Sequence, residues 1–269
     1  MKKIFHELLD FAVETAHEAG KITLKYFRAG VQAEFKTDDT PITIADHEAE
    51  KAIRARIEKK YPTHAICGEE FGDAGDEKAS HRWFIDPIDG TKVFMRGVPL
   101  YGVLIGLEIE GRVEVGAAYF PALDEMVYAA TGTGCFWNGR PAQVSQTQTI
   151  DRAFVSFTDP GTFEEFDRGE EWARIQKAVY HRVGWSDAYG HALVAIGATD
   201  VMLDPIMNPW DCGPFPVILR EAGGYFGDWC GNETIYASEA LSTTRRLLPD
   251  VLRVLDGNMN ASSDRANIK

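Results

Sequence analysis

Strand-like and helix-like runs alternate along most of this chain, and that alternation constrains the fold more than any other feature. Runs such as 65–67, 83–85 and 201–203 are apolar and have the length of buried strands. Longer runs between such strands repeat apolar residues every three or four positions, which is typical of helices. Strands that alternate with helices favour a layered architecture. The expected fold class is therefore α+β or layered α/β.

Two amphipathic helices are expected near the N-terminus. Apolar residues recur at helical spacing over 4–26, which predicts a long helix that ends near Gly30. A second helix has its apolar face over 45–57 and stops before Pro62. The polar, turn-rich residues 36–41 between them are expected to form an exposed loop.

The remaining elements are expected in a fixed order. Strands are predicted over 101–107, 113–120, 126–130 and 153–157, and helices over 172–179 and 187–196. Asn138-Gly139 is typical of a tight hairpin turn. A further helix is expected to end at 221–224, and a last one is expected over about 239–255.

The size and charge of the chain limit what it can bind. Of its 269 residues, 45% are hydrophobic, so a sizeable core can form in one large domain or two moderate ones. We expect an N-terminal half over 1–145, a C-terminal half over 146–256 and a frayed tail over 257–269. The net charge of −13 disfavours nucleic acid and membranes as main partners. An acidic chain suits a protein that gathers cations, although a solvated acidic surface is the simpler explanation.

The cysteines and the N-terminus indicate a cytoplasmic protein. Four cysteines are scattered without a C-x-x-C pair: Cys67, Cys135, Cys212 and Cys230. Single cysteines suit buried thiols in a reducing compartment and disfavour a zinc cluster. Acidic residues near the start interrupt any apolar core of a signal peptide. No apolar run approaches the ~20 residues that would span a bilayer.

The segment Asp86-Pro87-Ile88-Asp89-Gly90-Thr91 is the most informative stretch. It follows an apolar strand-like run, so two carboxylates are expected where a buried strand ends. Gly90 lets the backbone approach a ligand closely, and Thr91 can begin a helix whose N–H groups suit a phosphate. Mg²⁺ prefers a few carboxylates together with water and phosphate oxygens. An Asx-turn followed by a helix cap explains this pattern equally well when it is taken alone.

Two other acidic residues favour the same chemistry. Glu69 follows the apolar run 65–67, and ligands of α/β sheets bind beyond the carboxyl ends of strands. Asp211 precedes a helical stretch, where the role of an N-cap is about as well supported as that of a ligand. Each residue is therefore ambiguous by itself.

Four motifs occur in order along residues 4–255. They are Gly68-Glu69-Glu70, Asp86-Pro87-Ile88-Asp89-Gly90-Thr91, Gly132-x-Gly134 with Asn138-Gly139, and Trp210-Asp211 ending in Glu221-Ala222-Gly223-Gly224. Together they resemble the inositol monophosphatase superfamily. The resemblance implies a five-layer αβαβα sandwich of the inositol monophosphatase and fructose-1,6-bisphosphatase type. It also implies a homodimeric, Mg²⁺-dependent phosphatase with two or three ions in each active site.

The resemblance implies a set of metal ligands. Glu69, Asp86 and the carbonyl of Ile88 would bind the first Mg²⁺. Asp86, Asp89 and Asp211 would bind the second, and Glu69 would also face a third, more loosely held ion.

It also implies the residues that handle phosphate and water. Gly90 and Thr91 would hold the phosphate, Asp46 would partner Thr91, and Lys36 matches a basic residue of the preceding loop. A metal-activated water is the expected nucleophile, because metal ions neutralise the phosphate and lower the pKa of bound water. Thr91 would orient that water, and Glu69 would help to remove its proton.

Fewer residues indicate the substrate. Residues 89–100 and 185–190 resemble the bacterial histidinol-phosphate phosphatase branch. Asp187, Asp204 and Asp211 are the expected substrate contacts, and carboxylates suit the ammonium and imidazole groups of histidinol. The same carboxylates could bind the hydroxyls of inositol, and Asp187 could instead cap a helix.

Three positions depart from the family pattern. Pro216 lacks an N–H for the first turn of a helix capped by Asp211, so that helix would start later or be distorted. Asp204 is shorter than the glutamate often found at its position, and Trp185 is bulkier than the expected glycine.

Several functions are weighed against one another. Hydrolysis of histidinol phosphate is favoured, and hydrolysis of inositol 1-phosphate or other sugar phosphates is the alternative. A non-catalytic binding or regulatory protein on the same fold is the alternative of another class, but no expected ligand is missing. Hydrolysis of 3′-phosphoadenosine 5′-phosphate would favour a basic cluster near these motifs, and the sequence has none.

Overall fold

The computed structural model describes residues 2–30, 34–35 and 41–257. Its helices are α1 (Lys2–Tyr26), α2 (Ile44–Lys60), α3 (Thr91–Met95), α4 (Pro160–Glu165), α5 (Gly169–Ala178), α6 (Asp187–Ala195), α7 (Pro209–Cys212), α8 (Phe215–Glu221) and α9 (Leu248–Leu255). A 3₁₀ turn spans Ile150–Arg152. Lys36 and the predicted tail beyond Gly257 lie outside the described residues.

The strands form three sheets. They are β1 (Glu34–Phe35), β2 (Pro41–Ile42), β3 (Ala65–Gly68), β4 (Gly72–Ala74), β5 (His81–Asp89), β6 (Gly102–Ile109), β7 (Arg112–Phe120), β8 (Glu125–Ala130), β9 (Gly134–Trp137), β10 (Arg140–Ala142), β11 (Phe154–Ser156), β12 (His181–Val183), β13 (Val201–Asp204), β14 (Gly224–Gly227) and β15 (Ala240–Thr244). An eight-stranded sheet has the order β10-β9-β8-β7-β6-β5-β3-β4, and a five-stranded sheet has the order β12-β11-β13-β15-β14. The two-strand ribbon β1–β2 is separate from both.

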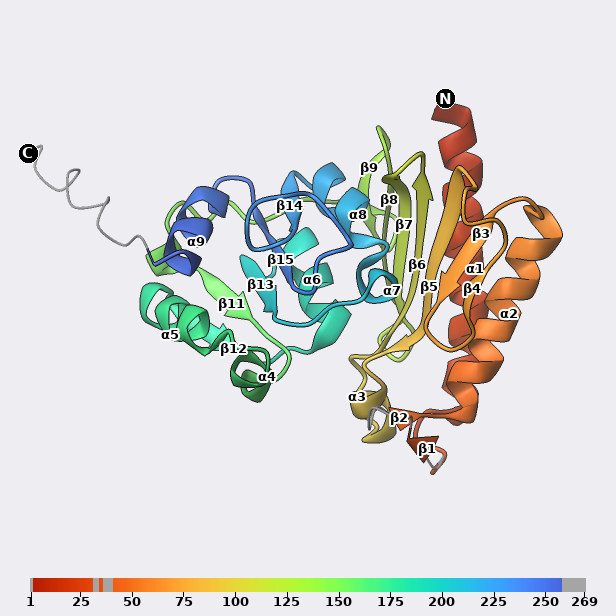
Figure 1. The fold of residues 1–269 in the computed structure, drawn as a ribbon, viewed down its shortest axis with the longest axis horizontal. Coiled ribbons are helices and arrows are strands. Elements are labelled where there is room, and N and C mark those ends of the chain that lie inside the picture. The colour runs from red at the N-terminus through yellow and green to blue at the C-terminus, as the bar shows by residue number, and fades with distance from the viewer. Residues whose placement is uncertain (1, 31–33, 36–40, 258–269) are drawn as a thin grey trace, which may run out of the picture.

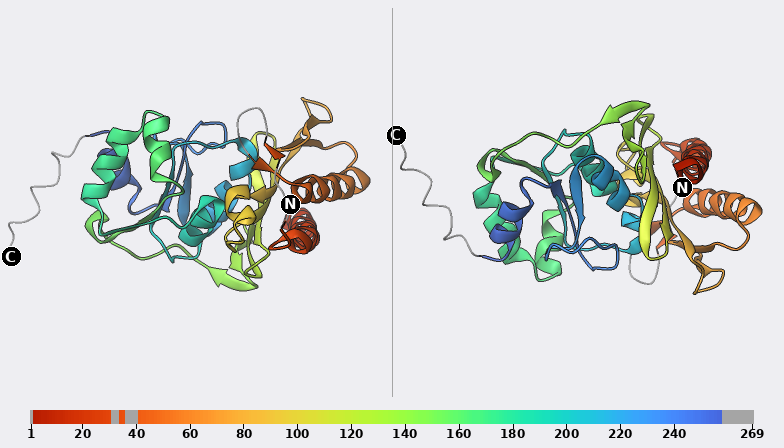
Figure 2. Two further views of the ribbon diagram at one scale, coloured as in Figure 1. Left: turned by 90° about the horizontal axis from the view of Figure 1, so that it is seen from below. Right: turned by 90° about the horizontal axis from the view of Figure 1, so that it is seen from above.

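Helices and sheets stack in five layers, as predicted. Helices α1 and α2 cover one face of the eight-stranded sheet, and α6 and α8 contact its other face (Figures 1 and 2). The same two helices pack against the five-stranded sheet, whose outer face is covered by α4, α5 and α9. The order of layers is therefore αβαβα.

Alternate residues of the central strands enter different cores. On β5, Phe84 packs in the core beside α6 and α8, whereas Trp83 and Ile85 pack beneath α1 and α2. On β6, Leu104 and Ile105 divide between the two cores in the same way. Because both faces are buried, these strands appear in the sequence as nearly continuous apolar runs.

A pair of glycines lets the C-terminal half approach the eight-stranded sheet closely. Gly106 and Gly116 are partners on β6 and β7. A Cβ on Gly106 would lie 2.3 Å from the carbonyl of Gly213, and one on Gly116 would lie 2.3 Å from the oxygen of Pro214. The connection between α7 and α8 therefore rests directly on the sheet, backbone against backbone.

This connection also explains how the helix accommodates Pro216. Helix α7 ends at Cys212 and α8 begins at Phe215, so the longer helix starts later than Asp211. Pro214 and Pro216 then lie in or before the first turn of α8, where no intrahelical N–H is needed.

The predicted helices over 4–26, 45–57, 172–179 and 187–196 are confirmed, with ends that differ by a few residues. The hairpin at Asn138-Gly139 is confirmed too, because both residues have positive φ and join β9 to β10. The helix predicted over 239–255 is wrong in its first part. Residues 240–244 form β15, which pairs with β13 on one side and β14 on the other.

Among the residues that the structure describes, no helix is long and apolar enough to cross a membrane.

Candidate active site

Strand β5 carries two aspartates across an irregular end. Its pairing with β6 shifts register between Asp86 and Asp89, which breaks the regular alternation of side chains. An oxygen of Asp86 accepts the N–H of Ile88 at 2.9 Å, which is the predicted Asx-turn. Oδ2 of Asp89 accepts the N–H of Ala188 at 2.9 Å and so ties β5 to the start of α6. Both carboxylates are buried.

Glu69 lies beside Asp86 at the end of the neighbouring strand. Strands β3 and β5 run parallel, with Gly68 opposite Ile85, so the next residue of each strand is acidic. The N–H of Glu69 donates to the carbonyl of Ile85 at 3.3 Å, which continues the ladder by one bond. Glu69 therefore lies just beyond the carboxyl end of a parallel strand, which is where α/β sheets bind their ligands.

Asp211 reaches this place from the C-terminal half. It is the third residue of α7, and Asn208 rather than Asp211 is the N-cap. Oδ2 of Asp211 accepts the backbone N–H of Asn208 at 2.9 Å and its side-chain amide at 3.0 Å. The close packing of Gly213 on Gly106 fixes where α7 ends and thus where Asp211 stands.

Two more aspartates of the C-terminal half face the same region. Asp204 ends β13, is buried, and accepts the hydroxyl of Thr158 at 3.1 Å. Asp187 begins α6 and accepts the hydroxyl of Ser186, which is the N-cap. A Cβ on Gly90 would lie 2.9 Å from Oδ2 of Asp187, so the predicted phosphate-binding turn and this carboxylate are close neighbours.

Gly90 and Thr91 form the turn into α3. Gly90 is the N-cap with φ +79°, a left-handed conformation that favours glycine. The hydroxyl of Thr91 donates to the carbonyl of Ile88 at 3.1 Å. Since a hydroxyl has one hydrogen, Thr91 cannot at the same time donate to Asp46, the partner assigned to it by the family resemblance.

Asp46 is instead part of a capping box at the start of α2. Its Oδ2 accepts the N–H of Thr43 at 2.8 Å and the hydroxyl of Thr43 at 2.5 Å. Its Oδ1 is buried and has no hydrogen-bond partner among the described residues. The spacing Thr43-x-x-Asp46 is a sequence signature of such a box and could have predicted this contact.

The carboxylates perturb one another strongly. Burial raises the pKa of Asp86 well above its usual range, and the charges of Glu69, Asp89, Asp211 and Asp46 add to that effect. Burial also raises the pKa of Asp89, with contributions from the charges of Asp187, Asp211 and Asp204. The seven predicted acidic residues therefore form one electrostatically connected cluster.

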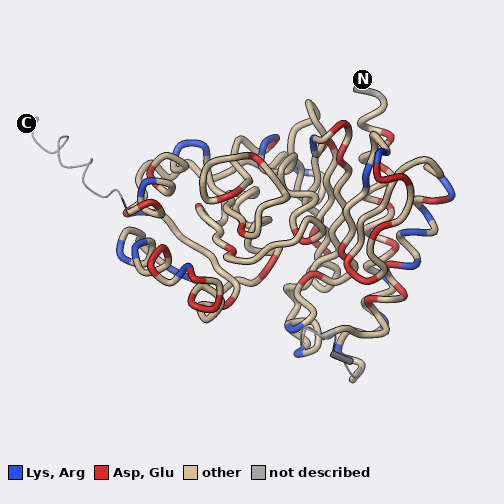
Figure 3. Tube along the Cα trace, in the orientation of Figure 1, with Lys and Arg blue, Asp and Glu red and all other residues tan. Residues whose placement is uncertain are grey.

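The same causes act on the acids of α2, α7 and β13. The pKa of Asp211 rises to about 7 and that of Asp46 to about 6, in each case mainly through burial and partly through the charge of Glu69. Burial and the charge of Asp187 raise the pKa of Asp204. Figure 3 shows acidic segments where the two halves meet, while basic segments lie mostly at the periphery.

The acidic side chains of the site offer the type of donor atom, carboxylate oxygen, that divalent metal ions bind. In the described part of the chain, no three His, Cys, Asp or Glu side chains already form a metal-binding group. Asp86, Asp89 and Asp211 each direct an oxygen to a backbone N–H, and each carboxylate keeps further acceptor capacity. Oδ1 of Asp46, which has no hydrogen-bond partner among the residues that the structure describes, belongs to the same acidic cluster. Oxygen ligands with excess negative charge are what Mg²⁺, Ca²⁺ and Mn²⁺ prefer.

Sequence reasoning missed the residues that support the acids. Thr43, Ser186 and Asn208 each hold one predicted carboxylate by a hydrogen bond. The capping signatures at Thr43 and Asn208 were visible in the sequence, because each has an aspartate three positions later. No short sequence motif around Thr158 indicates that it would be a partner of Asp204.

Comparison with known proteins agrees with this geometry. The model of the inositol monophosphatase family matches residues 5–261. A histidinol-phosphatase of Chlorobaculum parvum is 43% identical over 257 residues, which cover 93% of this chain and 96% of that protein. A fructose-1,6-bisphosphatase/inositol-1-monophosphatase of Thermotoga maritima is 31% identical, and the match covers 92% of this chain and 95% of that protein.

A solved structure gives the same result for the fold. The crystal structure of extragenic suppressor protein suhB from Bartonella henselae superposes with a TM-score of 0.85 at 26% identity. The match covers 93% of this chain and 98% of that one. The names of the two relatives from Chlorobaculum parvum and Thermotoga maritima indicate a phosphatase, in a family that is generally metal-dependent. This chain belongs to the inositol monophosphatase family.

Proposed function

We propose that this protein hydrolyses histidinol phosphate to histidinol and inorganic phosphate in a Mg²⁺-dependent reaction. The observation that carries the proposal is the extent of the acidic cluster. It contains the acids proposed as metal ligands, and it continues into Asp187 and Asp204. Carboxylates beyond those needed for metal would bind a cationic part of the substrate. The 43% identity to a histidinol-phosphatase supports the same substrate.

The proposed ligands are Glu69, Asp86, Asp89, Asp211 and the carbonyl of Ile88. When bound there, Mg²⁺ would neutralise phosphate charge and lower the pKa of water enough to supply a nucleophile at neutral pH. The carboxylates come from the ends of β3 and β5 and from α7, so both halves of the chain must be folded to complete the set.

Thr91 and the backbone of Gly90 would position the reacting groups. Because Thr91 donates its hydrogen to Ile88, its oxygen is left to accept a hydrogen bond from the attacking water. That bond would direct a lone pair of the water toward phosphorus. Glu69 would accept the proton of the water as the P–O ester bond breaks, and the alcohol leaves with a proton from solvent.

Asp46 would act through Glu69 and the nearby water. Its Oδ1 is buried without a partner among the described residues, so a donor placed there would be held strongly. In this proposal a water molecule takes that position and connects Asp46 to Thr91.

A panel of phosphate monoesters tests the substrate. We expect kcat/KM with Mg²⁺ to be highest for histidinol phosphate, lower for inositol 1-phosphate and lowest for 3′-phosphoadenosine 5′-phosphate. Asp204→Asn should raise KM for histidinol phosphate more than for inositol 1-phosphate, because it removes charge that only the cationic substrate uses. Equal activity on all three substrates would contradict the assignment to histidinol phosphate.

Hydrolysis of inositol 1-phosphate is the second candidate. It is favoured by the 31% identity to an enzyme named as an inositol-1-monophosphatase. A higher kcat/KM on inositol 1-phosphate, unchanged by Asp204→Asn, would support it over the first candidate.

A further inference from the structure

Helix α2 buries an ion pair one turn beyond Asp46. Glu50 is completely buried, and one of its oxygens accepts the Nε–H of Arg54 at 2.7 Å. Asp46, Glu50 and Arg54 are spaced by four residues and so lie on one stripe of the helix. The rest of the inner face is apolar, with Ala49 and Ile53 fully buried. A charged stripe inside such a face requires partners, because burying charge costs free energy.

The partners are backbone groups of the turn that follows Glu69. Glu50 accepts the N–H of Glu70 at 2.8 Å and the N–H of Phe71 at 3.2 Å. Nη2 of Arg54 donates to the carbonyl of Gly72. The buried pair thus holds three consecutive residues, which are Glu70 and Phe71 of the turn after β3 and Gly72 at the start of β4.

Gly68 provides the room for this arrangement. A Cβ there would lie 2.3 Å from Oε1 of Glu50 and 2.6 Å from Nη2 of Arg54. Directly after Gly68, the N–H of Glu69 continues the ladder to Ile85. Glu69 is therefore fixed from its own N–H and from the residues that follow it.

The fixed turn directs Glu69 toward the acids of the site. The side chain of Glu69 is close enough to Asp46, Asp86 and Asp211 for its charge to affect all three. Small changes in the turn would move this carboxylate relative to Asp86. A metal ligand must be held within a fraction of an ångström to keep its affinity, and the groups behind it supply that restraint.

We propose that Glu50 and Arg54 are positioning residues that hold Glu69 in place for binding a divalent cation. This role deepens the proposed function and rests on it for the part that concerns turnover. Changing one partner of a buried ion pair also lowers stability, so the positioning role is measured by the Mg²⁺ concentration at half-effect and not by stability itself.

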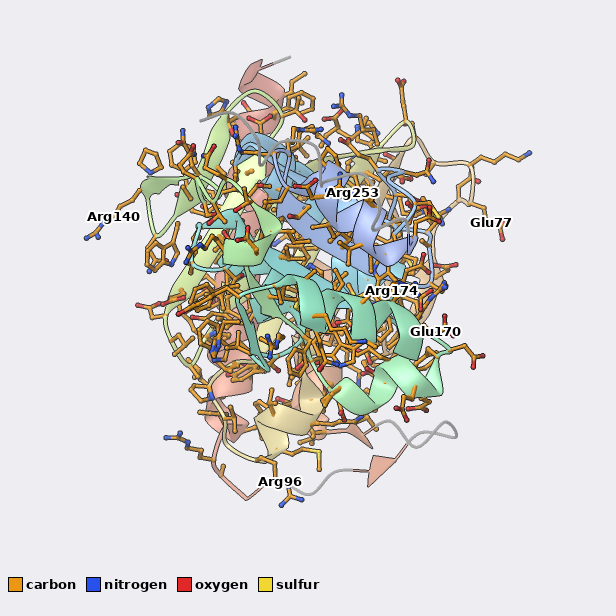
Figure 4. The ribbon with its side chains drawn as sticks, turned by 90° about the vertical axis from the view of Figure 1, so that its left-hand side faces the viewer. Glu77, Arg96, Arg140, Glu170, Arg174 and Arg253 are labelled. Carbon is orange, nitrogen blue, oxygen red and sulfur yellow. The ribbon has the colours of Figure 1, made fainter. Side chains whose placement is uncertain are left out.

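The test compares Glu50→Gln and Arg54→Lys with a change in an ion pair of the same spacing whose glutamate is exposed. In Glu50→Gln, the side-chain amide oxygen can still accept the N–H of Glu70, but the negative charge is lost. In Arg54→Lys, the ammonium group cannot reach both Glu50 and Gly72 as a guanidinium does. Glu170 and Arg174 on α5 form another pair at the same spacing, and Figure 4 shows them on the outer layer.

Glu170→Gln is therefore the control. Each protein is titrated with Mg²⁺, with thermal unfolding and phosphate release from histidinol phosphate as the two readouts. We expect the Mg²⁺ concentration at half-effect to rise by roughly 10- to 100-fold in both α2 variants and in both readouts. Glu170→Gln should keep the wild-type midpoint.

A purely structural role would give another pattern. If the α2 variants are less stable without Mg²⁺ but keep the wild-type midpoint, the positioning proposal is wrong. If Glu50→Gln does not fold, Arg54→Lys decides by the same criterion.

Failure of the proposed function would look different again. Wild-type protein would then release no phosphate at any Mg²⁺ concentration. The Mg²⁺ concentration at half-effect would still be measurable by thermal unfolding. A higher value in Glu50→Gln than in wild type would support the positioning role, and an equal value would contradict it.

Discussion

At the scale of single residues, the acids proposed as metal ligands also have structural roles. Asp86 forms the expected Asx-turn, whereas Asp211 is not the expected N-cap and instead accepts the N–H of the capping residue Asn208. Neither bond uses all the acceptor sites of a carboxylate, and the same residues lie in one buried acidic cluster. Backbone donors hold the carboxylates in place, and a cation would use their remaining lone pairs.

Asp89→Asn separates these roles. The amide oxygen can still accept the N–H of Ala188, whereas the charge proposed for metal binding is lost. We expect phosphatase kcat/KM to fall by about 10²-fold or more, as for loss of one group that stabilises a transition state. The unfolding temperature in chelator should stay the same or rise, since the substitution removes one buried negative charge.

Asp159→Asn is the control for that change. Asp159 also accepts a backbone N–H at the start of a helix, at 2.8 Å, but it is exposed and lies outside the acidic cluster. Wild-type turnover in Asp89→Asn, measured beside this control, would remove Asp89 from the proposed site.

His191 gives a prediction about pH and stability. It is fully buried against Phe215 and Phe226, its Nδ1 lies 2.7 Å from the hydroxyl of Ser242, and its Nε2 has no partner among the described residues. Burial lowers its pKa from 6.5 to about 3. Between these values the unfolded chain binds a proton that the folded chain does not, so folding stability falls as pH falls below 6.5.

The slope from this one residue reaches about 1.4 kcal/mol per pH unit. Urea unfolding of wild type and His191→Gln at about pH 5, 6 and 7 measures it. We expect the difference in unfolding free energy between the two proteins to shrink as pH falls. A difference that does not change with pH would mean that His191 is protonated in the folded state or exposed to solvent.

At the scale of elements, the connection between α7 and α8 shows how packing places a functional residue. Gly213 and Pro214 lie on Gly106 and Gly116 without intervening side chains. This contact brings Asp211, from the C-terminal half, beside the end of β5. The position of Asp211 therefore depends less on whether its segment is a helix or a strand than on how closely the backbone of this segment approaches the sheet.

Gly106→Ala tests that contact. Its Cβ would meet backbone atoms at 2.3 Å, which cannot move as a flexible side chain could. We expect a loss of about 1–3 kcal/mol in unfolding free energy, as for other overpacked sites, and weaker Mg²⁺ binding in the folded fraction. Gly169→Ala is the control, because its Cβ would meet its nearest neighbour at 3.4 Å. Equal effects of the two substitutions on Mg²⁺ binding would contradict the role of the glycine pair.

Sequence periodicity predicted the long helices and strands. It failed for the segment whose secondary structure depends on pairing with strands that are distant in the sequence. The strands around Phe84 and Leu104 have apolar residues on both faces, so their runs were clear. Residues 240–244 have no such signal, and Ser242 to Thr244 are polar but buried between two antiparallel neighbours. The last helix begins only at Leu248, with Pro249 in its first turn.

For the site, the motifs predicted acids that the structure brings together, but they could not predict the hydrogen-bond partners of these acids. Strand ends and turns are local, so Glu69, Asp86 and Asp89 were visible in the sequence. The bond from Ala188 to Asp89 joins residues 99 positions apart, and the bond from Thr158 to Asp204 joins residues 46 positions apart. Such contacts depend on the packing of two sheets through α6 and α8, which no short pattern describes.

At the scale of the whole molecule, the acidic cluster carries a repulsion that divalent cations would relieve. Carboxylates from both halves lie close together, and burial raises the pKa of most of them. A cation that binds only the folded state stabilises it according to its concentration and affinity. The two halves should therefore be held together more firmly in Mg²⁺ than in chelator.

We expect Mg²⁺ at about 100 times its dissociation constant to add about 2.7 kcal/mol to the unfolding free energy. For a chain of this size that corresponds to a rise in Tm of roughly 5–10 °C. Differential scanning calorimetry in Mg²⁺, or in chelator with NaCl of equal ionic strength, measures it. An equal Tm in both conditions would show that the cluster binds no cation.

The most direct test of the metal-dependent mechanism is the rate of phosphate release from histidinol phosphate as Mg²⁺ is titrated into chelator-treated protein. We expect no turnover without the ion, a rise to saturation as Mg²⁺ is added, and loss of that rise in Asp89→Asn. Full activity in excess chelator, or the same Mg²⁺ dependence in Asp89→Asn as in wild type, would contradict the mechanism.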